Sequence, residues 1–174
     1  MVLPLCSESI LHLTSTMSII SDAIQAKCLA FSDRIIKLND YLLVQAVAAH
    51  EDYRKSKIQK KGKQTSSFLR QTSDISVAAV PVYLQSVSNL CNQLLRAGTS
   101  IGANNAEASS AISKADFKSK SYIALKEARE SMYWLELLHR NNYLTDIQFN
   151  SLYADAEELV KVLTHRCKKL DGVE

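Results

Sequence analysis

Apolar residues recur along this chain at alternating steps of three and four positions, the spacing of one face of an α-helix. The first such stripe consists of Ile24, Cys28, Phe31, Ile35, Leu38 and Leu42. Three more stripes follow: Val80, Leu84, Val87, Cys91, Leu94, Gly98 and Ile101; then Phe117, Ser121, Ala124, Ala128, Ser131, Leu135 and Leu138; then Leu152, Ala156, Leu159 and Leu163. A helix with one apolar stripe buries it against neighbouring helices. Four stripes therefore predict an all-α, up-down antiparallel, left-handed four-helix bundle.

Polar residues between the stripes predict where the helices begin and end. Ser113 precedes Asp116 by three positions, which is typical of an N-cap with an acidic residue in the first turn. Thr145 and Gln148 fit a capping box at the start of the last helix. Asn141 and Asn142 are candidate stop residues for the helix before it. The predicted helices span residues 18–48, 74–110, 114–140 and 145–170.

Length and composition suggest one domain without a membrane span. The chain has 174 residues, of which 47% are hydrophobic and only four are Gly, as expected for a compact helical protein. Its longest apolar runs are far shorter than the ~20 residues of a transmembrane helix. Residues 1–18 contain no Lys or Arg, so a secretory signal is not predicted and we expect a cytoplasmic protein. We divide the chain into an N-terminal extension, residues 1–17, and one bundle domain, residues 18–174, with Met17 as an alternative start.

A basic segment separates the first two predicted helices. Within residues 49–73, six positive charges fall in ten positions without an acid among them: Arg54, Lys55, Lys57, Lys60, Lys61 and Lys63. The formal net charge is +3, so without these six the chain carries −3. Gly62, Ser66 and Ser67 favour a mobile insertion. It is either a solvated linker or an electrostatic arm for phosphates, and the second interpretation predicts nucleic-acid binding.

The stretch from Gln93 to Leu138 resembles a known family. It contains QLLRAGTSIGANNAEA, then SKADF, then IALKEARESMYWLELL, and residues 30–38 resemble the family's first helix. The family is that of the four helix bundle proteins, also called 23S ribosomal RNA intervening-sequence proteins. The resemblance implies an up-down bundle that forms a ring-shaped homo-oligomer, a pentamer, without an established catalytic activity. It also implies suspected nucleic-acid binding, and a related bundle serves the reverse transcriptase of diversity-generating retroelements.

The matched motif contains small and charged residues that we assign to helix or subunit packing. These residues are Arg96, Gly98, Gly102, Asn104, Glu107, Lys126, Arg129 and Trp134. Gly98 and Gly102 form a GxxxG spacing, which favours close helix contact, because the Lys and Ser/Thr of a phosphate-binding loop are missing. Arg96 and Glu107 are eleven residues apart, or three turns, and so share one helix face. We expect both to contact other helices or subunits, with ligand binding as the alternative.

No residue set predicts an enzyme, a metal site or a cofactor. The four His residues lack an HExxH or paired ExxH setting, and the four Cys residues lack CxxC spacing. Cys28 and Cys91 fall on apolar stripes, where a free thiol behaves as a small hydrophobe. Two hypotheses remain. The chain is a non-enzymatic homo-oligomer that binds RNA or single-stranded DNA, or it is an adaptor that docks a partner protein such as a reverse transcriptase.

Overall fold

Four α-helices make up the computed structural model, which describes residues 7–61 and 73–172. Side chains are described within 21–52, at 55 and within 85–172. The helices are α1 (Ser7–Lys61), α2 (Ser73–Ser109), α3 (Lys114–Arg140) and α4 (Asp146–Asp171). The described residues contain no β-strand. The prediction of an all-α protein with four helices is confirmed.

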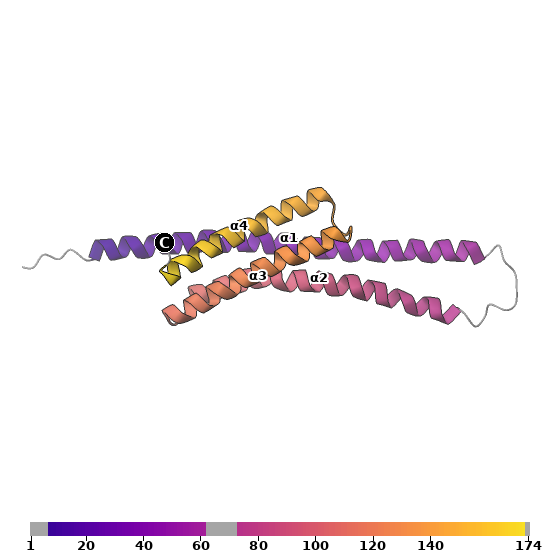
Figure 1. Ribbon diagram of the computed structural model, residues 1–174, viewed down its shortest axis with the longest axis horizontal. Helices are drawn as coiled ribbons and strands as arrows, with labels where there is room; N and C mark the ends of the chain where they lie inside the picture. The colour runs from indigo at the N-terminus through magenta and orange to yellow at the C-terminus, as the bar shows by residue number, and fades with distance from the viewer. Residues whose placement is uncertain (1–6, 62–72, 173–174) are drawn as a thin grey trace, which may run out of the picture.

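The helices form two hairpins of unequal length. In Figure 1, α1 and α2 run side by side as a long hairpin, and the shorter α3–α4 hairpin lies along part of it. Packing follows chain order, since α2 contacts both α1 and α3, and α4 packs on α3 and more sparsely on α1. The far end of the α1–α2 hairpin extends beyond the α3–α4 turn (Figure 1). The handedness of the bundle stays a prediction.

The first helix is longer than predicted. The sequence placed it at residues 18–48, whereas α1 runs from Ser7 to Lys61 and includes much of the segment interpreted as an insertion. The prediction followed apolar stripes and read a charged segment as a loop. Residues 49–61 contain no Gly or Pro, and four Lys and one Arg are among them, residue types that favour helix without a buried stripe. The other three helices begin and end within one residue of the predicted positions.

The predicted stripes account for most of the core. All six residues of the first stripe are buried, as are Val87, Cys91 and Ile101 of the second. The small residues of the third stripe, Ser121 and Ala124 among them, are fully buried, while Phe117 is only half-buried. All four predicted residues of the last stripe are buried too.

Two glycines bring α1 and α2 together. A Cβ at Gly98 would lie 3.0 Å from Cγ1 of Ile35, and a Cβ at Gly102 would lie 3.3 Å from Cβ of Cys28. Ser32 on α1 donates a hydrogen bond of 3.3 Å to the carbonyl oxygen of Gly98. The backbone of α2 therefore lies directly against side chains of α1, at a separation that a larger residue would disturb.

Both predicted N-caps are confirmed. Ser113 accepts a hydrogen bond from the backbone N–H of Asp116. Thr145 and Gln148 form a complete capping box at the start of α4. These caps satisfy backbone donors that the first helical turn leaves unpaired, so they fix where the α3–α4 hairpin begins and turns.

Polar contacts along α1 hold α4 in place. The Arg34 guanidinium forms an ion pair with Asp155 and donates to the hydroxyl of Ser151 at 2.7 Å. Lys27 forms a second ion pair with Glu158 at 2.7 Å. These side chains are partly exposed, so each pair adds modest stability and mainly sets the position of α4 along α1.

Candidate functional site

The basic residues predicted to bind nucleic acid lie at the end of a helix. Five of the six belong to α1, namely Arg54, Lys55, Lys57, Lys60 and Lys61, and Lys63 lies outside the described residues. At about 100° per residue, four of them fall within an arc of about 120° around the helix axis, and Lys55 lies outside it. Lys55 Nζ is 3.9 Å from Asp52 Oδ1, and both side chains are exposed. The helix thus holds the basic positions in a fixed row.

This basic row lies on the part of α1 that extends past the α3–α4 turn (Figure 1). We call residues 54–61 the basic end of α1. From Ala49 to Lys61 the helix rises about 18 Å, at 1.5 Å per residue. Only α2 accompanies α1 along this part of the hairpin. Neither α3 nor α4 lies along this part of the α1 helix in Figure 1.

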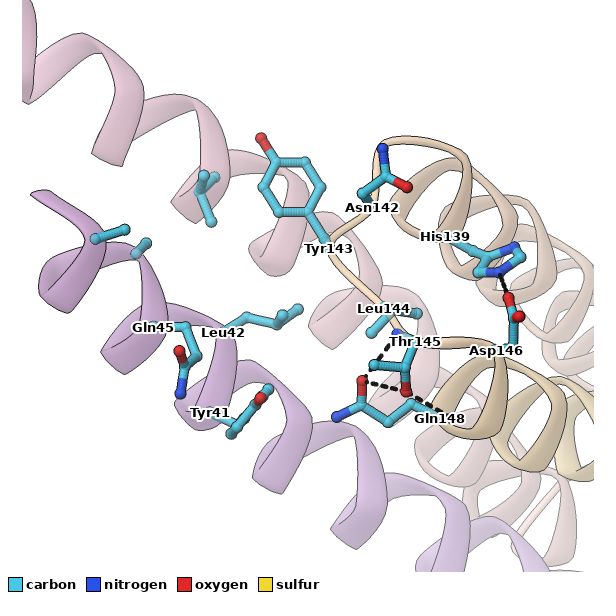
Figure 2. Close-up of a pocket in the computed structure, with 13 residues that line it drawn as sticks. Tyr41, Leu42, Gln45, His139, Asn142, Tyr143, Leu144, Thr145, Asp146 and Gln148 are labelled. Carbon is cyan, nitrogen blue, oxygen red and sulfur yellow. Dashed lines mark hydrogen bonds and ion pairs between the residues drawn. The ribbon is translucent and has the colours of Figure 1, made fainter.

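An open pocket lies where the covered part of α1 ends. Its volume is about 630 Å³, and it is bounded by one wall of α1, by Val87 of α2 and by the α3–α4 turn. The residues that line it are Tyr41, Leu42, Gln45, Ala46, Ala49, Val87, His139, Asn142, Tyr143, Leu144, Thr145, Asp146 and Gln148. Figure 2 shows Tyr41 and Gln45 on α1, on the other side of the opening from Thr145 and Gln148 of the turn.

The pocket has an apolar floor and a polar rim that carries no Lys or Arg. Leu42, Ala46 and Leu144 are buried, whereas Tyr41 is 46% exposed. Gln45 and Asn142 are exposed as well. Such walls suit a flat, uncharged ring with hydrogen-bonding edges better than a phosphate, since no Lys or Arg lines the pocket.

The turn that forms the second wall is fixed by local hydrogen bonds. Gln148 Oε1 accepts from the backbone N–H of Thr145 at 3.0 Å, so its amide nitrogen is left on the side that faces α1 in Figure 2. Asn142 adopts a left-handed conformation, with φ of 60°, which Asn tolerates better than most residues. The wall is thus preformed.

A histidine closes the outer edge of the pocket. His139 Nε2 lies 2.8 Å from Asp146 Oδ1, and its ring stacks on Phe149 with centroids 4.2 Å apart. Phe149 in turn contacts Tyr153. These contacts fix the imidazole through both its face and its edge. Sequence reasoning missed the pocket because its two walls are about a hundred residues apart in the chain, and Asn142 was read only as a stop signal.

The motif residues assigned to packing do not meet at the pocket. Glu107 on α2 forms an ion pair with Lys120 on α3. Asn104 donates to the Ser100 carbonyl oxygen at 2.8 Å within its own helix. The Trp134 indole donates to Glu130 Oε1 at 3.2 Å. The remaining charged residues of the motif are exposed: Arg96, Lys126 and Arg129.

One carboxyl group near these exposed cations, that of Glu127, has a shifted pKa. Partial burial raises the pKa of the Glu127 carboxyl, and the nearby Glu130 acts in the same direction. Lys126 and Arg96 act in the opposite direction, which places the Arg96 charge near α3. The arrangement is a mixed-charge surface shared by α2 and α3, and whether it contacts another subunit stays a prediction.

A buried polar cluster that the sequence did not predict joins three helices. Asn105 on α2 is fully buried. Its amide donates to Gln25 Oε1 on α1 at 2.5 Å, and its Oδ1 accepts from Arg166 on α4 at 2.6 Å. The Arg166 guanidinium also lies over the Phe117 ring of α3, 5.7 Å from its centroid. Burial lowers the pKa of Arg166.

The thiols within the described residues are buried core groups. Cys28, Cys91 and Cys167 are free and buried. Burial raises the pKa of the Cys28 thiol to about 11, although the Arg166 charge acts in the opposite direction. Among the residues that the structure describes, no group of three or more His, Cys, Asp or Glu side chains is placed to hold a metal ion. Within that same part of the chain, no helix is long and apolar enough to cross a bilayer.

Comparison with known proteins identifies the fold family. The family model of the 23S rRNA-intervening sequence protein matches residues 72–165. The chain belongs to this family. A solved structure from Bacteroides thetaiotaomicron, described as a protein with unknown function from the S23 ribosomal protein family, is 33% identical. The match covers 86% of this chain and 98% of that one, with a TM-score of 0.58. No curated protein matches the chain.

The matched range of the family model separates two parts of the molecule. Residues 72–165 contain α2 and α3 and most of α4, with the glycines that pack on α1 and the capped α3–α4 turn. The basic end of α1 and the α1 wall of the pocket precede this range. The family model therefore covers three of the four helices, and the basic end of α1 is interpreted from its own chemistry.

Proposed function

We propose that this 23S rRNA-intervening sequence family protein is a non-enzymatic homo-oligomer that binds RNA or single-stranded DNA through the basic end of α1. The observation that carries the proposal is the continuation of α1 to Lys61, which sets five basic residues on one helix beyond the α3–α4 turn. Phosphate contacts by Lys and Arg supply most of the affinity of proteins that bind nucleic acid without sequence preference.

The charge distribution supports one binding surface over a generally basic protein. The net charge is +3, and the chain without the six basic residues carries −3. A polyanion is therefore attracted to one end of the molecule and repelled elsewhere. A helical row also loses less conformational entropy on binding than a flexible arm, because its backbone is already ordered.

Self-association is supported by the outer face of α1. Leu29, Ile36 and Val47 are 56%, 43% and 48% exposed, and their spacings of seven and eleven residues place them on one side of the helix. Val44, 65% exposed, lies beside them. Exposed apolar rows of this kind mark protein contacts. A ring of such chains, a pentamer by family resemblance, would repeat the basic end around its axis and increase avidity.

The same apolar row favours the second candidate function. An adaptor that docks a partner protein, such as a reverse transcriptase, needs an exposed apolar surface, and α1 supplies one. The two candidates differ in which residues of α1 they need. Nucleic-acid binding needs the basic end. Docking of a partner protein needs the apolar row and does not need the basic end.

Binding assays on a charge-neutral variant test the proposal. In the variant, all six basic residues from Arg54 to Lys63 are changed to Gln. A matched control neutralises six other cations that are exposed: Lys37, Lys114, Arg140, Lys161, Lys168 and Lys169. We expect single-stranded RNA to bind the control nearly as well as the wild type and to bind the first variant much more weakly. Equal binding by both variants would show that overall charge, not the basic end, drives association.

A further inference from the structure

The pocket beside the α3–α4 turn and the basic end of α1 are arranged as two parts of one surface. Lys57 lies eleven residues after Ala46, and Lys60 lies eleven residues after Ala49. Eleven residues make three helical turns, so these basic positions share the side of α1 that carries the two pocket alanines. The rise between them is about 16 Å. Both parts lie along the stretch of α1 where the α3–α4 hairpin ends.

The two parts have complementary chemistry. The pocket offers the exposed ring of Tyr41, the amides of Gln45 and Gln148, and an apolar floor. No cation lines it. The basic end offers cations and follows a helix rather than a concave surface. The basic end therefore suits a phosphate, and the pocket suits an uncharged aromatic ring with polar edges.

We propose that the pocket accepts an unpaired nucleobase of a single strand whose phosphates run along α1 toward Lys60. This inference rests on the proposed function and gives it a ligand class. Tyr41 would stack on the base, and the amides of Gln45 and Gln148 would meet its hydrogen-bonding edge. Side-chain stacking on a base is sequence-tolerant, since every base has a π-face. A base held in a duplex is excluded, because it would have to leave its stack to enter the pocket.

The dimensions and rigidity of the pocket fit this ligand. Its volume of about 630 Å³ lies within the range of small-molecule sites and leaves room for one nucleoside with water. The capping box holds Gln148, and Asp146 with Phe149 holds His139, so the turn side of the pocket is ordered before binding. Asp146 adds a negative charge at the rim that would repel a phosphate and direct the backbone of the strand outward, toward the basic end.

Single-residue variants on the full-length protein test the inference. The probes are short labelled single-stranded RNAs of one base type and a duplex of the same length, titrated at several salt concentrations. The variants are Tyr41→Ala, Tyr41→Phe and Gln45→Ala, with Tyr133→Ala as the matched control, because Tyr133 is a 56% exposed tyrosine on α3. Tyr41 is a surface residue, so its replacement leaves the core intact.

We expect Tyr41→Ala to weaken single-stranded RNA binding about fivefold or more, as loss of one stacked base predicts. Tyr41→Phe and Tyr133→Ala should bind like the wild type. The salt dependence should stay unchanged in Tyr41→Ala, because no cation is removed, whereas neutralising the basic end should flatten it. Duplex binding should not respond to Tyr41→Ala.

The possible failures are distinguishable. If the wild type binds single-stranded RNA and loses binding with the basic end but not with Tyr41→Ala, the pocket inference is wrong and the proposed function stands. If Tyr41→Ala weakens duplex and single strand equally, the pocket does not hold an unpaired base. A wild type that binds no RNA overturns both proposals. Loss of a protein partner in Tyr41→Ala with unchanged RNA binding would assign the pocket to that partner and refute the inference.

Discussion

Arg166 on α4 donates a hydrogen bond of 2.6 Å to Oδ1 of Asn105 on α2, inside the bundle. Asn105 is fully buried, and its amide nitrogen donates a second hydrogen bond to Gln25 on α1. One amide therefore pairs with side chains on two neighbouring helices. Such a contact forms in only one register of the helices, so it selects that register over shifted alternatives.

Replacing this amide should cost more than replacing its neighbour. Asn105→Ala removes this partner from the half-buried Arg166 guanidinium and Gln25 carbonyl, so we expect the free energy of unfolding to fall by about 1–3 kcal/mol. Asn104→Ala is the control, because Asn104 is only half-buried and bonds to its own helix. Urea denaturation measures both. Equal losses would mean that the buried network adds no specific stability.

Gly98 should resist substitution despite its helical position. Exchanging a helical Gly for Ala normally stabilises by up to about 1 kcal/mol. At Gly98 the new Cβ would lie 3.0 Å from the Ile35 side chain, so we expect a net loss of about 1–3 kcal/mol. A double-mutant cycle with Ile35→Ala measures the clash, since Gly98→Ala should cost little in that background. An additive cycle would contradict close packing at this point.

Cys28 should make stability depend on alkaline pH. Burial raises its pKa from 9.0 to about 11 in the folded protein. Between these values the unfolded chain releases the proton and the folded chain keeps it, so stability falls as pH rises from about 9 to 11. Below the unfolded pKa this group has no pH effect, and the total loss is about 3 kcal/mol. Urea midpoints should fall less steeply over this window in Cys28→Ala than in the wild type. An equal fall of the urea midpoint with pH in both proteins would refute the raised pKa of Cys28.

The outer row of α1 should control assembly. Ile36→Glu with Val44→Glu places two charges among exposed apolar side chains, and we expect the oligomer to dissociate. The control is Ile112→Glu with Ile147→Glu, since these isoleucines are 96% and 84% exposed and lie elsewhere. Light scattering measures the mass of each. A monomeric wild type at micromolar concentration would contradict the proposed homo-oligomer.

The four helices and most of their buried residues could be predicted from the sequence, because the patterns that mark them span only a few residues. Heptad spacing marks the buried residues of each helix, and Thr145 with Gln148 lie three residues apart, so one turn reveals the cap. The end of α1 was misread because its charged residues carry helix propensity without an apolar stripe. For residues 49–61, helix propensity was the signal in the sequence that could have predicted the longer α1.

The candidate site was harder to predict because its contacts are long-range. Asn105 meets Gln25 across 80 residues and Arg166 across 61. Tyr41 and Gln148 meet at the pocket only after four helices have packed. Nothing in the local sequence of Tyr41 distinguishes it from any exposed tyrosine on a helix. The basic residues were identified by composition, but their arrangement in a row needed the helix.

The salt dependence of RNA binding by the wild type tests the central claim most directly. If six cations of the basic segment engage a single strand, the slope of log K against log salt should be about −4 per chain. Changing all six to Gln should bring the slope close to zero, and the matched control variant should keep it. A wild-type slope near zero, or an unchanged slope in the six-Gln variant, would contradict the assignment of the basic end of α1 as the nucleic-acid interface.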